Sequence, residues 1–142
     1  MFTDYRVIES ASEVPEFVWS DPDLAVERFM PEREGDDYCT RLWFFFGEAE
    51  LGYRCLAREP IVKSSNTFKR EPIACVPDEL RALREELGFD YGKFDYGIVD
   101  GEVVLYDANR TPAYGALNAE QIGQRLDALE NGVRGFLTER VP

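Results

Sequence analysis

Three oxygen-bearing side chains fall near the ends of one predicted hairpin in the stretch FDYGIVDGEVVLYDANRTP, residues 94–112. Asp100-Gly101 is a dipeptide typical of a type I′ turn, which brings Asp95 close to Asp107 across the strand pair. Strand alternation puts Asp107 and Asn109 on the same side of their strand. Two carboxylates and an amide suit Mg²⁺, whose shell is usually completed by water and by substrate phosphates. The hairpin is therefore a candidate metal site.

The same residues also have a plainer interpretation. Asp and Asn are common where strands end, because their side chains hydrogen-bond to nearby backbone groups. The sequence Asp107-Ala108-Asn109 could simply end a strand in this way. The spacing by itself leaves both interpretations open.

The composition limits the class of protein to which the chain can belong. Its 142 residues fit a single domain, residues 1–142. A hydrophobic content of 44% and an aromatic content of 13% indicate a folded globule. The net charge of −12 argues against binding to nucleic acid or to an anionic membrane. A local cluster of arginine, lysine and metal could still bind a nucleotide.

Cysteine usage and the absence of histidine argue against a zinc site and against histidine-activated nucleophiles. Cys39, Cys55 and Cys75 show no CxxC spacing, and we expect them to be small buried thiols in a reducing compartment. Without histidine, neither a zinc site nor a Ser-His or Cys-His nucleophile is expected. No apolar run reaches membrane-spanning length, and the N-terminus MFTDYR lacks the apolar region of a signal peptide. We therefore expect a cytoplasmic protein.

Hydrophobic periodicity predicts an α+β fold with a mainly antiparallel sheet and flanking helices. The predicted strands cover residues 5–8, 24–30, 38–47, 50–59, 92–99 and 102–109. Residues 31–37 and 60–77 are predicted loops, because they are rich in charge or proline.

Three helical segments are predicted. A brief helical turn in SASEVPEFVW is limited by Pro15. The segment 77–88 is predicted as a helix capped by Asp78 and ended by Gly88. A C-terminal helix, 118–140, is predicted to begin at Asn118.

The stretch LGFDYGKFDYGIVDGEVVLYDANRTP resembles the C-terminal metal-binding stretch of the ATP-grasp superfamily. In that family a helix ends in a glycine-containing turn and the next strand carries an Asp. The strand after it ends in Glu or Asp, any residue, and Asn. Asp95, Asp107 and Asn109 fall on those positions, although Asp107 is one methylene shorter than the commoner Glu. The resemblance implies that these three residues hold Mg²⁺ and that Arg110 stabilises phosphoryl charge.

Upstream segments extend the resemblance over residues 5–115. VERFM is similar to the family's hinge strand, which implies an adenine-binding role for four residues: Glu27, Arg28, Phe29 and Met30. YCTRLWFFFG resembles a strand of the ribosomal-protein glutamate ligase branch, with Arg41 in the place of an arginine that stabilises phosphoryl charge. AREPIVKSSNTFKR resembles the basic loop of that branch, which implies that Lys63, Ser65 and Asn66 lie near the phosphates. A plain buried strand and a solvated basic loop are the alternatives for the first and last of these segments.

The resemblance implies one half of an ATP-grasp domain that binds ATP and Mg²⁺ and comes from a family of carboxylate–amine or carboxylate–thiol ligases. That family acts through an acyl-phosphate, and the small carboxylate substrate is not indicated here. Its substrate domain and lysine-bearing lid would precede residue 1, so we expect a chain that is incomplete on its own. It could be truncated, or be completed by a lid-bearing partner chain, and a homo-oligomer also stays open. The alternative is a non-catalytic nucleotide-binding or interaction module descended from such an enzyme, and whether the chain is an enzyme is left open.

Overall fold

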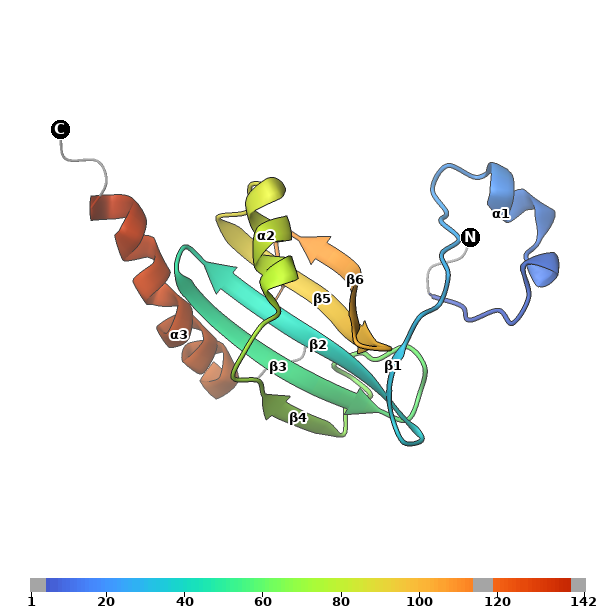
Figure 1. Cartoon of the computed structure of the whole chain (residues 1–142), viewed down its shortest axis with the longest axis horizontal. Helices are drawn as coiled ribbons and strands as arrows, with labels where there is room; N and C mark the ends of the chain where they lie inside the picture. Colours follow the sequence, from blue (N-terminus) through green and yellow to red (C-terminus); the bar gives the residue numbers. More distant parts are fainter. Residues whose placement is uncertain (1–4, 114–118, 139–142) are drawn as a thin grey trace. The chain divides into compact units, whose positions relative to one another are not determined.

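The computed structural model describes residues 5–113 and 119–138, and it has the expected α+β fold with an antiparallel sheet (Figure 1). The chain divides into two compact units, residues 1–30 and residues 31–142. Within the part of the chain that is described, no helix is long and apolar enough to cross a lipid bilayer.

Between residues 5 and 30, the first unit forms two short helical elements. A 3₁₀ turn, η1, spans Ala11–Glu13, and a helix, α1, spans Glu16–Ser20 directly after Pro15. This agrees with the predicted helical turn. The strands predicted at 5–8 and 24–30 are wrong, because the described residues of these segments pair with no other strand. Apolar density predicted them, but an extended run becomes a strand only beside a partner.

The second unit is built on a six-stranded sheet in the order β4-β3-β2-β5-β6, with β1 paired to β2. Neighbouring strands are antiparallel throughout. The strands are β1 (Glu32–Glu34), β2 (Asp37–Phe46), β3 (Ala49–Ala57), β4 (Lys69–Pro72), β5 (Tyr91–Val99) and β6 (Glu102–Asn109).

Two hairpins, β2–β3 and β5–β6, confirm the strand pairs that the sequence predicts. The predicted loops 31–37 and 60–77 each contain a short strand, β1 and β4 respectively. Their sequences, ERE and KREP, show no alternation of apolar and polar residues, so the sequence gives no sign of pairing there.

The β5–β6 turn has the predicted type I′ conformation. Asp100 and Gly101 have φ angles of 53° and 85°, and both must be positive in this turn. Counting from the turn alone would pair Asp95 with residue 106. A bulge between the partners of Asp95 and Tyr96 adds one residue to β6, so Asp95 pairs with Asp107 instead.

The two faces of the sheet carry different side chains. The core lies on the face covered by helix α2 (Asp78–Glu86), which we call the α2 face. Leu80 packs there against the aromatic side chains of Trp43, Phe45, Phe89, Phe94 and Tyr96. Helix α3 (Ala119–Thr138) packs on the opposite side, the α3 face, where Phe44 and Phe46 alternate with the core residues. The rings of Phe46 and Phe136 of α3 lie 5.8 Å apart.

The helix ends agree with the sequence in part. Gly88, with a φ of 63°, follows α2 as predicted. The predicted cap at Asp78 is wrong, because Pro77 occupies the N-cap position and makes no side-chain hydrogen bond. Helix α3 confirms the predicted C-terminal helix, but its predicted cap, Asn118, lies outside the described residues.

Candidate metal site on the α3 face

Asp95 and Asp107 are direct partners across the β5–β6 ladder, and Lys93 and Asn109 form the next pair on the same face. Asp95 also pairs with Leu42 of β2, which alternates with the core residues of that strand. The four polar side chains therefore lie on the α3 face. The structure thus brings together the three residues for which the sequence predicts metal binding.

Lys93 adds a cation to this group. Its Nζ donates a hydrogen bond to Asp95 Oδ2 at 2.8 Å, and the two side chains are 19% and 23% exposed. The other carboxylate oxygen, Asp95 Oδ1, is buried and accepts no hydrogen bond from the described residues. Burial raises the pKa of Asp95 above its ordinary value, the Lys93 ammonium opposes this shift, and the Asp107 carboxylate adds to it. A further cation at this position would stabilise both carboxylates.

Asn109 also ends its strand in the way that the plainer interpretation describes. Its Oδ1 accepts a hydrogen bond from the Thr111 backbone N–H at 2.7 Å. The Thr111 hydroxyl lies 3.5 Å from the same oxygen, at the long limit for a hydrogen bond, so a metal ion at Asn109 would have to displace only this weak second contact.

The carboxylates of this group are too few to form a metal cage by themselves. Across residues 5–113 and 119–138, no group of three or more His, Cys, Asp or Glu side chains could hold a metal ion. Mg²⁺ is commonly held by only one or two carboxylates together with substrate phosphates. Asp95, Asp107 and the Asn109 amide therefore fit an ion that is shared with a phosphate group, and they do not form an all-protein cage.

Arg41 lies elsewhere in the sheet. It lies two residues before Trp43 on β2 and therefore shares the α2 face with it. Its Nε and Nη2 donate to Glu32 Oε2 and Oε1, each at 2.8 Å, and the Ile98 backbone N–H donates to the same carboxylate at 2.7 Å. Arg41 thus belongs to a partly buried ion pair with β1, and the structure does not bring it to the carboxylate pair.

Arg110 contacts the end of α2. Its Nη1 and Nη2 donate to the carbonyl oxygens of Gly88 and Leu87 at 3.1 and 2.6 Å. The guanidinium also lies over the Phe89 ring, 4.1 Å from its centroid. A cation is favourable at this place, because the last carbonyls of a helix carry partial negative charge.

Asn66 organises the loop between β3 and β4. Its Oδ1 accepts from the Lys63 backbone N–H at 2.8 Å, and its Nδ2 donates to Glu59 Oε2 and to the Ile61 carbonyl, each at 2.9 Å. These contacts lie within the loop. Lys63 and Ser65 are exposed there, and their predicted contact with phosphates stays a prediction.

The predicted adenine-binding residues, Glu27, Arg28, Phe29 and Met30, lie in the first unit. They belong to a stretch that forms neither helix nor strand, so the expected hinge strand is not formed. Their role in binding adenine stays a prediction.

Lys93 is the residue of this group that the sequence analysis missed. Its position two residues before Asp95 places it on the same face of the strand, which the alternation rule could have indicated.

No protein-family model matches the chain, and no curated protein matches it.

Proposed function

We propose that the chain binds Mg²⁺–ATP on the α3 face of its sheet, as one half of an ATP-grasp ligase site. The observation that carries the proposal is the direct opposition of Asp95 and Asp107, with Asp95 Oδ1 buried and lacking a hydrogen bond among the described residues. A buried carboxylate oxygen without a partner is unfavourable, and a bound cation would compensate for it.

Each residue of the group has a role in this proposal. Asp95, Asp107 and Asn109 would hold Mg²⁺, which neutralises phosphate charge when it is bound. The Lys93 ammonium has three donor hydrogens and directs one to Asp95. The other two can serve a phosphate oxygen, so Lys93 would stabilise the same charge from the protein side.

The reaction class follows from the sequence resemblance. A substrate carboxylate oxygen attacks the γ-phosphorus of ATP, the bond to the β–γ bridging oxygen breaks, and ADP leaves. An amine or a thiol then displaces phosphate from the acyl-phosphate. Such transfer depends on positioning and on charge neutralisation more than on covalent work by protein groups. Two paired strands hold their side chains in fixed positions, as this chemistry requires.

A non-catalytic nucleotide-binding module is the second candidate, and the contacts of two arginines favour it. Arg41 is paired with Glu32, and Arg110 is bound to the end of α2. Neither guanidinium contacts the carboxylate pair, so the two cations expected to stabilise phosphoryl transfer have other partners. A module of this kind would bind Mg²⁺–nucleotide without turning it over.

The proposal is tested by calorimetric titration of the whole chain with ADP, once with Mg²⁺ and once with EDTA. We expect weak binding that requires Mg²⁺. Lys93→Met should weaken binding, whereas Lys69→Met should not, because Lys69 is half exposed and paired with Glu71 on β4. The absence of binding heat at millimolar Mg²⁺–ADP would contradict the proposal. ATP turnover that Asp107→Ala abolishes would favour the ligase, and binding without turnover would favour the module.

A further inference from the structure

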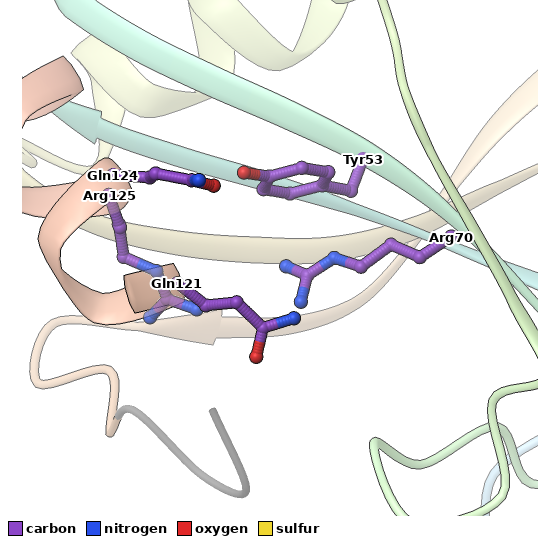
Figure 2. A pocket seen from close by; sticks show the side chains of 5 residues that line it. All are labelled: Tyr53, Arg70, Gln121, Gln124 and Arg125. Atoms are coloured by element: carbon purple, nitrogen blue, oxygen red, sulfur yellow. The ribbon is translucent and has the colours of Figure 1, made fainter. Parts of the chain in front are cut away.

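A small pocket lies between β3, β4 and the beginning of α3 (Figure 2). Its volume is about 100 Å³, and its lining consists of Tyr53, Arg70, Gln121, Gln124 and Arg125. Two guanidinium groups thus border a space that no carboxylate lines among the described residues. Such a local cluster of cations is unexpected in a chain with a net charge of −12, and it favours an anionic ligand.

Arg70 is held in a defined orientation at this pocket. Its Cζ lies 3.9 Å from the centroid of the Tyr53 ring, a distance typical of cation–π stacking. Figure 2 shows its guanidinium reaching from β4 past this ring toward Gln121 of α3. The Nε atom is buried and has no hydrogen-bond acceptor in the described part of the chain. A buried donor of this kind is costly unless a ligand satisfies it.

Arg125 provides the second cation from the other side. It is only 6% exposed, and its Cζ lies 3.9 Å from the centroid of the Phe44 ring. Phe44 is also the cross-strand partner of Lys93, so Arg125 lies next to the candidate metal site.

The pocket and the carboxylate pair lie on one face of the sheet. Tyr53 pairs with Leu42, and Leu42 pairs with Asp95, so the backbones of Tyr53 and Asp95 are separated by two strand spacings, about 10 Å. The two sites are therefore close enough to hold neighbouring parts of one reaction.

We propose that this pocket binds a small carboxylate, with Arg70 and Arg125 as the cations that hold it. The Nε and one Nη of a guanidinium form a parallel pair of donors that matches the two oxygens of a carboxylate. The volume corresponds to a few water molecules, which suits an acid of a few carbon atoms. Its assignment as the acid substrate of the ligase rests on the proposed function, whereas its binding to the pocket does not.

The test is a titration of the whole chain with acetate, succinate or inorganic phosphate. Binding is monitored by NMR, in a solution that contains EDTA and no nucleotide. We expect saturable binding of a carboxylate that Arg70→Gln weakens at least about tenfold, since a hydrogen bond to a charged group is lost. Arg33→Gln is a matched control, because Arg33 stacks on Tyr38 at 4.0 Å outside the pocket. It should leave carboxylate binding unchanged.

A second pair of variants serves if Arg70→Gln does not fold. Gln121→Glu adds a negative charge at the pocket and should weaken carboxylate binding, whereas Asn131→Asp adds the same charge to an exposed part of the same helix. Equal effects of these two variants would overturn the proposal. Tighter binding of phosphate than of either carboxylate would also overturn it.

The outcome also separates this inference from the proposed function. Carboxylate binding that depends on Arg70, together with no binding of Mg²⁺–ADP, would contradict the proposed ligase function and support the proposed carboxylate pocket. Binding of Mg²⁺–ADP without binding of any carboxylate would overturn the proposal that the pocket binds a carboxylate. It would still support the proposed metal site.

Discussion

Asp107 lies directly opposite Asp95 because a bulge adds one residue to β6 between the turn and this pair. Without the bulge, residue 106 would oppose Asp95 and the side chain of Asp107 would face the other side of the sheet. A slip of one residue reverses the face of every side chain beyond it. The bulge therefore creates the carboxylate pair, and it places two like charges together, of which Asp95 is paired with Lys93.

Asp107→Asn should separate stability from ligand binding. Removing one of two facing charges relieves their repulsion, so the variant should melt at the same temperature as the wild type or slightly higher. The rise in melting temperature that Mg²⁺–ADP produces should be lost. Thermal melts with and without Mg²⁺–ADP measure both effects.

Asp36→Asn, in the exposed turn between β1 and β2, is the control and should change neither property. A strand-end role for Asp107 predicts the reverse. Its loss would cost about 0.5–2 kcal/mol and leave the ligand effect intact. That result would show the metal assignment to be wrong.

Arg41→Met should destabilise the fold strongly. It leaves the Glu32 carboxylate, whose side chain is 10% exposed, with its negative charge uncompensated. Breaking a buried pair costs about 3–5 kcal/mol, and we expect the lower end because Arg41 is 20% exposed. The double variant Glu32→Gln/Arg41→Met should be more stable than Arg41→Met alone. Denaturant unfolding of the wild type, the single variant and the double variant measures these differences. An Arg41→Met variant as stable as the wild type would contradict a structural role for Arg41.

The pH dependence of stability should reflect the same ion pair. Burial acts to raise the pKa of Glu32, but hydrogen bonds from Arg41 and Ile98 outweigh it and hold the pKa below its ordinary value. A carboxyl whose pKa falls on folding contributes stability that is complete above its unfolded pKa and is lost as pH drops through the folded one. The free energy of unfolding of the wild type should therefore decrease from about pH 4.5 downward. The Glu32→Gln variant should show a smaller decrease over this range, and parallel curves would contradict the assignment.

The elements that the sequence predicts correctly depend on local chemistry. The hairpin 92–109 follows from Asp100-Gly101, whose positive φ angles only a few residues adopt easily. Helix α2 follows from its apolar spacing and from Gly88. The same turn predicts that Asp95 and Asp107 lie close together. It does not predict that they are direct partners, because the bulge has no sequence signature.

The features that the sequence did not reveal depend on contacts between distant segments. Arg41 has a suitable residue type for phosphate binding, but its partner is on β1, a strand of three charged residues that periodicity cannot detect. Arg70 and Arg125 come from β4 and α3, which are distant in sequence and meet only through the sheet. The segment 24–30 has the composition of a strand but pairs with no strand among the described residues. Residue types could be recognised in each case, whereas their partners could not.

Arg110→Ala should destabilise α2 and its junction with β5. The guanidinium satisfies the carbonyl oxygens of Leu87 and Gly88 and stacks on Phe89. The loss of exposed hydrogen bonds of this kind costs about 1–2 kcal/mol. Arg58→Ala is a suitable control, since its guanidinium lies farther from a ring, 5.9 Å from the centroid of Phe68. Denaturant unfolding should show the difference, and equal effects would contradict a capping role.

Helix α3 touches the β2–β3 hairpin through a glycine. A Cβ atom on Gly132 would lie 1.7 Å from the Phe46 carbonyl oxygen, so only glycine permits this approach. A Cβ atom on Gly135, three residues later in the same helix, would meet nothing within 4 Å. The two glycines therefore form a matched pair that differs in contact with the sheet.

Gly135→Ala should stabilise the protein by up to about 1 kcal/mol, because alanine is the better helix former. Gly132→Ala gains the same helix propensity, but α3 must move away from the hairpin, so the net effect should be a loss of stability. Since α3 carries Gln121, Gln124 and Arg125, Gly132→Ala should also weaken carboxylate binding, whereas Gly135→Ala should not. Thermal melts and the acetate titration measure the two effects. If both variants are stabilised equally and bind acetate equally, α3 is not seated on the sheet through Gly132.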